Sequence, residues 1–163
     1  MLKIEKGNTN EILRKVSEEI KINEIKKYVN IGKEMLKYIK NPDNGGIGLA
    51  APQVGYNKRL IVVGLPEDRD DENFSFLMMI NPVIMEHTDE VEVDTEGCLS
   101  LPGRKGEVER YSGIKLEYLD EKGQKRILVL NHLKARIVQH EIDHLNGILF
   151  TDKTLKVFYK SSL

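Results

Sequence analysis

The sequence is short of several residue types and patterns, and each shortage excludes a class of protein. It has 163 residues but a single cysteine, Cys98, so no intramolecular disulfide can form and a disulfide-stapled secreted scaffold is excluded. Its longest apolar runs, such as 60–63 and 76–80, have the length of a strand, whereas a membrane helix needs roughly 20 apolar residues. Lysine and arginine number 25 against 26 acidic residues, so no global positive charge attracts nucleic acid.

The remaining composition is that of an ordinary globular protein. Hydrophobic residues make up 40% and charged residues 31% of the chain, which argues against extended disorder. The N-terminal residues show neither a signal-peptide pattern nor a transit-peptide pattern. We therefore expect one domain spanning residues 1–163, soluble and cytoplasmic.

Two helices are predicted in the N-terminal quarter of the chain. The first follows Asn8 or Asn10, either of which can cap it, and carries apolar residues at helical spacing as far as Ile20. The second follows Asn23 and carries one apolar stripe. The proline and glycines of segment 41–46 end it.

The chain from there to residue 130 is predicted to form mostly strands. Apolar runs at 60–63, 76–80 and 83–85 have strand length, and an acidic segment at 67–73 is expected to be an exposed loop. The alternation of valines and acidic residues at 90–94 is typical of a half-buried strand. The turn residues 120–123 predict a hairpin formed by the flanking runs.

A final helix is predicted between Asn131, a cap residue, and Gly147, which would lie just past its end. Leu133, Ile137, His140 and His144 fall at offsets 0, 4, 7 and 11 along it. Residues at these offsets share one helix face, so two histidines take the place of apolar residues on the buried side.

These histidines belong to the motif H-E-x-x-H at residues 140–144. Two imidazoles four residues apart on a helix can bind one metal ion, and the adjacent Glu141 can accept a proton from water polarised there. The alternative is a helix whose histidines are merely packed in the core. The spaced pair together with its glutamate favours the metal site.

Two histidines do not complete a catalytic metal site, so a third protein ligand is expected. The sole acid after His144 is Asp152, which follows Gly147 too closely to be an attractive ligand. Cys98 offers a thiolate, a strong ligand for a borderline-soft metal, beside a glycine that permits close approach. A lone cysteine would otherwise be interpreted as a small buried hydrophobe.

The small residues of segment 46–53 allow backbone or substrate to come near, and Gln53 offers an amide donor. On its own this segment is equally consistent with a glycine-rich turn before a packed strand. The residues by themselves leave three functions open: an open metallohydrolase site, a zincin-like peptidase, and a closed structural zinc or peptide-binding module. The closed site would need a fourth ligand, for which His87 and His132 are the remaining histidines.

Taken together, three motifs resemble the peptide deformylase family. G-x-G-L-A-A-P-Q stands intact at 46–53, E-G-C-L-S at 96–100 and Q-H-E-x-D-H-x-x-G at 139–147, in the family's order. The resemblance implies an α+β fold in which antiparallel β-sheets pack around a central C-terminal helix that carries H-E-x-x-H, with helices at the N-terminus. It also implies a metal-dependent hydrolase that removes the N-formyl group from the formylmethionine of nascent polypeptides and releases formate.

The resemblance assigns roles to residues by matching position. Cys98, His140 and His144 would bind the metal, and Glu141 would act as general base and then general acid. The backbone N–H of Leu99 and the side-chain amide of Gln53 would stabilise the oxyanion, and Gly48 would hydrogen-bond the peptide backbone. The residues around the methionine pocket would be Ile47, Gly97, Leu133 and Ile137.

The resemblance also implies the cofactor and partners. One divalent ion is expected, iron(II) in the cell, with zinc, nickel and cobalt as the alternatives that His₂Cys ligation accepts. The partners would be formylated nascent peptides, with a transient ribosome contact. We expect no direct nucleic-acid binding, no membrane association and a monomeric state.

Three basic residues are expected near the site. Arg104 and Lys105 could meet the carbonyl groups of an extended peptide, or form an exposed charged loop. Arg110 is predicted to pair with Asp143 and so orient a ligand.

Overall fold

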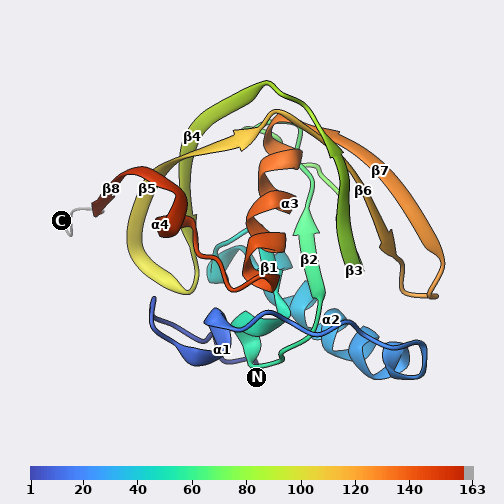
Figure 1. Cartoon of the computed structure of the whole chain (residues 1–163). Helices are drawn as coiled ribbons and strands as arrows, with labels where there is room; N and C mark the ends of the chain where they lie inside the picture. Colours follow the sequence, from blue (N-terminus) through green and yellow to red (C-terminus); the bar gives the residue numbers. More distant parts are fainter. Residues whose placement is uncertain (160–163) are drawn as a thin grey trace.

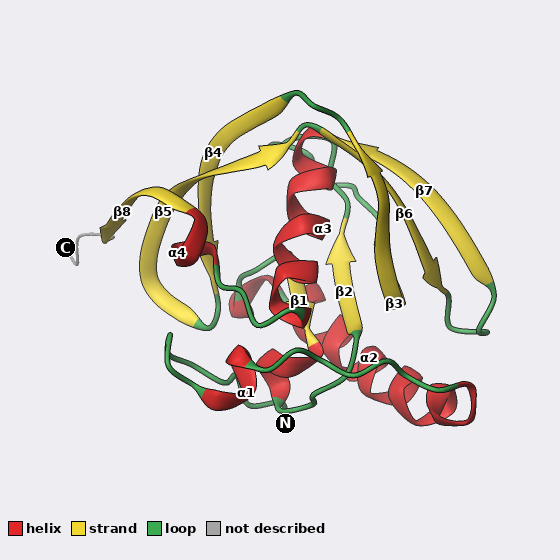
Figure 2. Ribbon diagram, in the orientation of Figure 1, coloured by secondary structure: helices red, strands yellow, loops and turns green. Residues whose placement is uncertain are grey.

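The computed structural model describes residues 1–159. Helix α3 (His132–Leu145) stands at the centre, with a sheet on either side and the N-terminal helices below in the view of Figure 1. Over the described residues the strands form a larger and a smaller sheet, with antiparallel pairing throughout (Figure 2). The predicted α+β architecture around a C-terminal helix is confirmed. None of the helices in residues 1–159 is both long and apolar enough to cross a membrane.

The larger sheet has the strand order β1-β2-β3-β6-β7. Its strands are β1 (Gly48–Ala50), β2 (Leu60–Gly64), β3 (Phe76–His87), β6 (Gly113–Leu119) and β7 (Lys125–Asn131). Strand β2 is buried on both faces: Ile61 and Val63 belong to the core around α3, while Leu60 and Val62 belong to the core beneath α2 (Ile25–Lys40). Burial on both faces explains why the run at 60–63 is apolar without alternation.

The apolar runs at 76–80 and 83–85 prove to be parts of one strand, β3, where the sequence suggested a break at Asn81-Pro82. The strand pairing is irregular between Ile80 and Val83, and Asn81 has a φ of 50°. The side chain of Asn81 accepts from the backbone N–H of Ile20 and donates to the backbone oxygen of Ile20. This contact with the N-terminal segment lets the strand absorb a proline through a local bulge instead of ending there.

The smaller sheet has the order β4-β5-β8 and is formed by β4 (Val91–Cys98), β5 (Leu101–Tyr111) and β8 (Thr154–Tyr159). The strand predicted at 90–94 is confirmed as part of β4, but its valines are not the buried side, because Val91 and Val93 are 41% and 51% exposed. The buried residue of this strand is Glu96. Arginines from β5 and α3 bind it, so β4 turns its polar side inward.

The first predicted helix is shorter than expected. Helix α1 (Glu11–Arg14) has the predicted cap, Asn10, whose side chain accepts from the backbone N–H of Ile12 and Leu13. Beyond it the chain is extended, because Ser17 donates its backbone N–H to Leu145 at the end of α3. The apolar spacing at 12–20 therefore does not continue as a helix, and Val16 is 66% exposed.

The second predicted helix is confirmed as α2, which buries the apolar stripe formed by Tyr28, Val29, Met35 and Ile39. Short helical turns complete the fold at η1 (Ile22–Glu24), η2 (Pro42–Asn44), η3 (Ala51–Val54) and α4 (Phe150–Lys153). The central helix begins after Asn131 and ends before Gly147, as predicted. Gly147 has a φ of 72°, and a Cβ there would lie 2.4 Å from the backbone oxygen of Arg14, so only glycine fits.

Candidate active site

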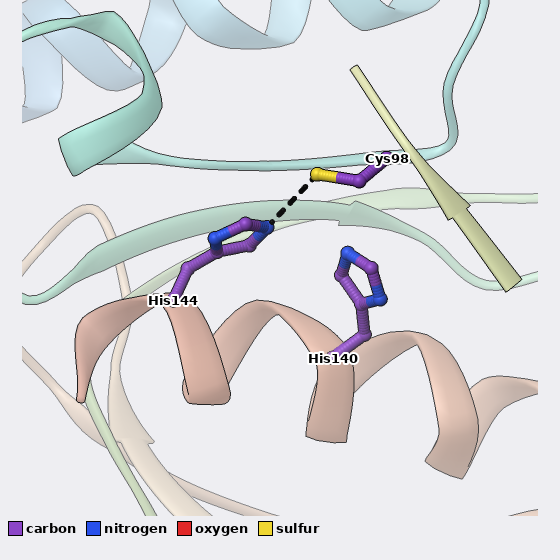
Figure 3. Close-up of side chains that lie close together, drawn as sticks. All are labelled: Cys98, His140 and His144. Carbon is purple, nitrogen blue, oxygen red and sulfur yellow. Dashed lines mark hydrogen bonds between the residues drawn. The ribbon is translucent and has the colours of Figure 1, made fainter. Parts of the chain in front are cut away.

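Three potential metal ligands meet between α3 and the smaller sheet. Cys98 comes from the end of β4, and His140 and His144 from successive turns of α3; Figure 3 shows the three side chains facing one another. One ligand atom from each residue lies within 4.8 Å of the others, and Cys98 Sγ is 3.3 Å from His144 Nε2. Ligand atoms around a tetrahedral ion with bonds of about 2.0–2.3 Å are expected roughly 3.5 Å apart. This His₂Cys arrangement therefore fits a divalent transition metal.

The other two histidines lie elsewhere. His87 stacks on Tyr111 with ring centroids 3.7 Å apart, and His132 contacts the carboxylate of Glu92. Neither belongs to the ligand group found among the described residues. The closed structural site therefore loses the fourth ligand that the sequence offered it.

A buried carboxylate holds His140 from behind. Glu96 Oε1 lies 2.8 Å from His140 Nδ1, which leaves the other ring nitrogen of His140 for a ligand. Glu96 also accepts hydrogen bonds from Arg110 Nε at 2.9 Å and from Arg136 Nη1 at 2.6 Å. Burial by itself would raise the pKa of Glu96, but the hydrogen bonds from Arg110 and His140 hold this pKa far below its usual value. The carboxylate therefore stays ionised and fixes the ring of His140.

Residue type and spacing assign no role to Glu96, although it is the first residue of the E-G-C-L-S motif. A carboxylate two residues before a candidate ligand, in a chain with an unexplained Arg136 on the predicted helix, was the available signal. The predicted partner of Arg110 is confirmed: Arg110 Nη1 lies 2.5 Å from Asp143 Oδ2. Arg110 thus connects Glu96 on β4 with Asp143 on α3, the two elements that carry the ligand group.

The carboxyl group of Glu141 is buried against the backbone of β1. A Cβ built on Gly48 would lie 2.6 Å from Glu141 Oε1, and Oε2 has no hydrogen-bond partner within residues 1–159. Burial raises the pKa of Glu141 to about 7, against the opposing effect of the neighbouring His140. A carboxyl group with such a pKa can both accept and release a proton near neutral pH.

Gln53 lies on η3, and its side chain is almost completely buried. Its Oε1 accepts from the backbone N–H of Ala50 at 2.9 Å, which fixes the orientation of the amide. Its Nε2 donates to Ser100 Oγ at 3.1 Å and lies 3.5 Å from Cys98 Sγ. A donor thus stands beside the ligand group, where developing negative charge could be stabilised.

A cavity of about 510 Å³ opens over these groups. All of the predicted site residues except His144 line it, namely Ile47, Gly48, Gln53, Gly97, Cys98, Leu99, Leu133, Ile137, His140 and Glu141. His144 is 1% exposed and lies behind the cavity wall. Arg104 and Lys105 also line the cavity, so their predicted position near the cleft is confirmed. The loop between β2 and β3, which no sequence motif indicated, also lines the cavity and supplies Pro66, Asp68, Arg69, Asp71 and Phe74.

Comparison with known proteins gives a consistent result. The sequence profile described as polypeptide deformylase matches residues 1–157. The chain is 46% identical over 125 residues to a peptide deformylase of Thermosynechococcus vestitus, covering 76% of this chain but only 64% of the relative's length. It is 44% identical over 144 residues to peptide deformylase 1 of Clostridium acetobutylicum, covering 88% of each. The crystal structure of a class I type b peptide deformylase from Acinetobacter baumannii with bound Met-Ala-Ser superimposes with a TM-score of 0.84 at 36% identity, covering 94% of this chain and 98% of the other.

Proposed function

This chain belongs to the polypeptide deformylase family, and we propose that it hydrolyses the N-formyl group of the formylmethionine that begins nascent polypeptides, releasing formate. The family is metal-dependent, and the group formed by Cys98, His140 and His144 is the proposed metal site. We propose iron(II) as the ion in the cell, as the resemblance to the family implies. Zinc, nickel and cobalt are the alternatives, because His₂Cys ligation suits all four metals. A divalent ion at this place would polarise both water and the formyl oxygen.

The proposed reaction uses Glu141 as the group that carries the proton. As water adds to the formyl carbon, Glu141 accepts its proton; as the C–N bond breaks, Glu141 returns the proton to the leaving amine nitrogen. The products are formate and a free N-terminal amine. The burial of this carboxyl group, which raises its pKa, supports both steps.

Negative charge develops on the formyl oxygen during this addition. The side-chain amide of Gln53 and the backbone N–H of Leu99 are the proposed donors to it, and loss of one such donor typically costs about 3 kcal/mol. The hydrogen bond from the backbone N–H of Ala50 to Gln53 Oε1 supports this role, because it fixes the amide with Nε2 beside Cys98 Sγ.

The substrate is proposed to be a peptide with a formylated methionine at its N-terminus. Ile47, Gly97, Leu133 and Ile137 would surround the methionine side chain, and Gly48 would hydrogen-bond the peptide backbone. The apolar lining of the cavity by these residues supports the assignment. The bound Met-Ala-Ser of the Acinetobacter baumannii structure is consistent with a peptide product of this kind.

The domain organisation, the oligomeric state and the place of action of the protein are proposals as well. We propose that residues 1–163 act as one domain and that the protein is a cytoplasmic monomer that meets its substrates at the ribosome by transient contact. Mass measurement in solution tests the monomeric state, and co-sedimentation with translating ribosomes tests the ribosome contact.

The observation that carries the proposal is the burial of the Glu141 carboxyl group beside the His₂Cys group. The test is formate release from formyl-Met-Ala-Ser by protein loaded anaerobically with iron(II), or with nickel. We expect Glu141→Ala to lose at least about 10²-fold in kcat while retaining its metal, because the proton acceptor is gone. Glu121→Ala, which removes an exposed glutamate from the hairpin turn, is the matched control.

Normal turnover by the metal-loaded Glu141→Ala protein would overturn this mechanism. Cleavage of internal peptide bonds without preference for a formylated terminus would instead favour the zincin-like peptidase that the H-E-x-x-H motif alone allowed.

A further inference from the structure

The loop between β2 and β3, residues 65–75, forms one wall of the cavity. Five of its residues line the cavity, and most of its charged residues are exposed to solvent. Buried apolar residues such as Ile137 also line the cavity. The β2–β3 loop differs from them in that it forms a solvent-exposed part of the cavity wall.

Two ion pairs tie this loop to the elements that carry the ligand group. Glu67 pairs with Lys134 in the first turn of α3, the helix of His140 and His144. Arg69 Nη2 lies 2.7 Å from Asp94 Oδ2 and donates to the backbone oxygen of Thr95 at 3.1 Å. Asp94 and Thr95 lie on β4, the strand that ends at Cys98.

The base of the loop is fixed independently of these ion pairs. The backbone N–H of Leu65 donates to the backbone oxygen of Ser75 at 2.9 Å, and Asp71 accepts from the backbone N–H of Glu67 and of Asn73. Phe74 lies so close to Gly64 that a Cβ on the glycine would come within 2.5 Å of its ring. Loss of the Arg69 contact should therefore release one side of the loop without unfolding it.

We propose that Arg69 is a positioning residue for the part of the substrate beyond the formylated methionine. By pairing with Asp94, Arg69 holds the β2–β3 loop as the wall along which the second and third residues of the peptide lie. This inference rests on the proposed function, since it assumes a peptide that continues past the methionine. The methionine and its formyl group would be bound by other residues.

The strength of the ion pair between Arg69 and Asp94 can be judged from the exposure of the two side chains. The side chains of Arg69 and Asp94 are 60% and 47% exposed. Exposed ion pairs contribute little and are screened by salt, so the wall should be adjustable and its effect moderate. We expect loss of the Arg69–Asp94 pair to change the affinity for a longer peptide about three- to fivefold. The chemical step itself should change little.

The test compares two substrates, formyl-Met-Ala-Ser and formyl-Met-amide. The measured ratio is kcat/KM for the tripeptide divided by kcat/KM for the amide. In Arg69→Ala this ratio should fall about three- to fivefold, mainly because KM for the tripeptide rises. Asp94→Ala should give the same loss, and the double variant should lose no more than either single variant. The charge-exchanged pair Arg69→Asp with Asp94→Arg should recover part of the ratio.

Arg126→Ala is the matched control, because Arg126 pairs with Asp120 on the distant β6–β7 turn and is similarly exposed. Its ratio should equal that of the unsubstituted protein. Added sodium chloride should lower the ratio more in the unsubstituted protein than in Arg69→Ala, because only the Glu67–Lys134 pair remains to be screened in the variant.

The outcomes separate this inference from the proposed function. Formate release from neither substrate by the unsubstituted, metal-loaded protein would overturn both. Activity on both substrates with a ratio that Arg69→Ala and Asp94→Ala leave unchanged would overturn this inference alone. Equal losses on both substrates in Arg69→Ala would also overturn it, because they would indicate a general disturbance of the site.

Discussion

Gly48 leaves no space for a side chain beside the carboxyl group of Glu141. Because a Cβ on Gly48 would lie 2.6 Å from Oε1 and 2.9 Å from Cδ of Glu141, any larger residue must displace the proposed proton carrier. Glycine is needed here for close approach and not for backbone conformation, since Gly48 does not have a positive φ. The G-x-G pattern therefore has a local chemical reason at its second glycine.

At this scale we predict that Gly48→Ala lowers kcat by about 10²-fold, because a shift of Glu141 by roughly 1 Å spoils the geometry of proton transfer. Formate release under saturating substrate measures the effect. Metal content and the urea midpoint should stay close to those of the unsubstituted protein. Full activity in Gly48→Ala would show that Glu141 tolerates displacement and would count against its role.

Some residues of the site could be predicted from the sequence and others could not. The ligand group and Glu141 could be named from spacing and residue type, because the geometry of a helix places residues four apart on one face. The role of Glu96 could not be predicted in this way, because its contacts with His140, Arg110 and Arg136 join three elements, β4, β5 and α3. Such contacts depend on which elements become neighbours in space.

Pairs of elements far apart in the chain are joined by a few polar contacts. Arg14 at the end of α1 donates to both carboxylate oxygens of Asp152 on α4, at 2.5 and 3.2 Å. Asp152 also accepts from the backbone N–H of Leu149 at 3.0 Å. The residue that made an unattractive metal ligand in the sequence instead connects the N-terminal segment to the region after the central helix.

The hydrogen bond from Arg14 lowers the pKa of Asp152 from its usual value. A carboxyl group with a lowered folded-state pKa adds stability above its unfolded pKa of about 4, and this stability is lost as the pH falls through the folded value. We predict that Asp152→Asn lowers the free energy of unfolding at pH 7 by less than about 1 kcal/mol, as is usual for a half-exposed pair. The difference from the unsubstituted protein should shrink from pH 5 toward pH 3.

Urea unfolding at several pH values measures this difference, and Asp43→Asn, on the short turn after α2, is the control. A difference that grows on acidification would contradict the assigned sign.

In the whole molecule, the site is formed by residues from three separate parts of the fold. The histidines come from the central helix, Cys98 from the smaller sheet and Gln53 from the turn that follows the first strand of the larger sheet. An ion held by Cys98, His140 and His144 would therefore link the smaller sheet to the helix. Only the folded chain has this arrangement, so metal binding should stabilise it.

We predict that removing the metal with a chelator abolishes formate release and lowers the Tm by about 5 °C or more, as expected when a tightly bound ion is lost from a domain of this size. Differential scanning calorimetry before and after re-addition of nickel or anaerobic iron(II) measures the shift. In Cys98→Ala the same treatment should change the Tm little. An unchanged Tm in the unsubstituted protein would indicate that the three side chains do not share an ion.

The central helix, its histidine face and the apolar runs of the sheets could be predicted from the amino-acid sequence, because each of them follows from the residue pattern within one segment. The order of the strands, the inward-facing polar side of β4 and the tie between Arg69 and Asp94 were decided only by tertiary structure. These features depend on contacts between residues that are not neighbours in the chain, such as Glu96 and Arg110, 14 positions apart, and Arg69 and Asp94, 25 positions apart, which no local pattern encodes.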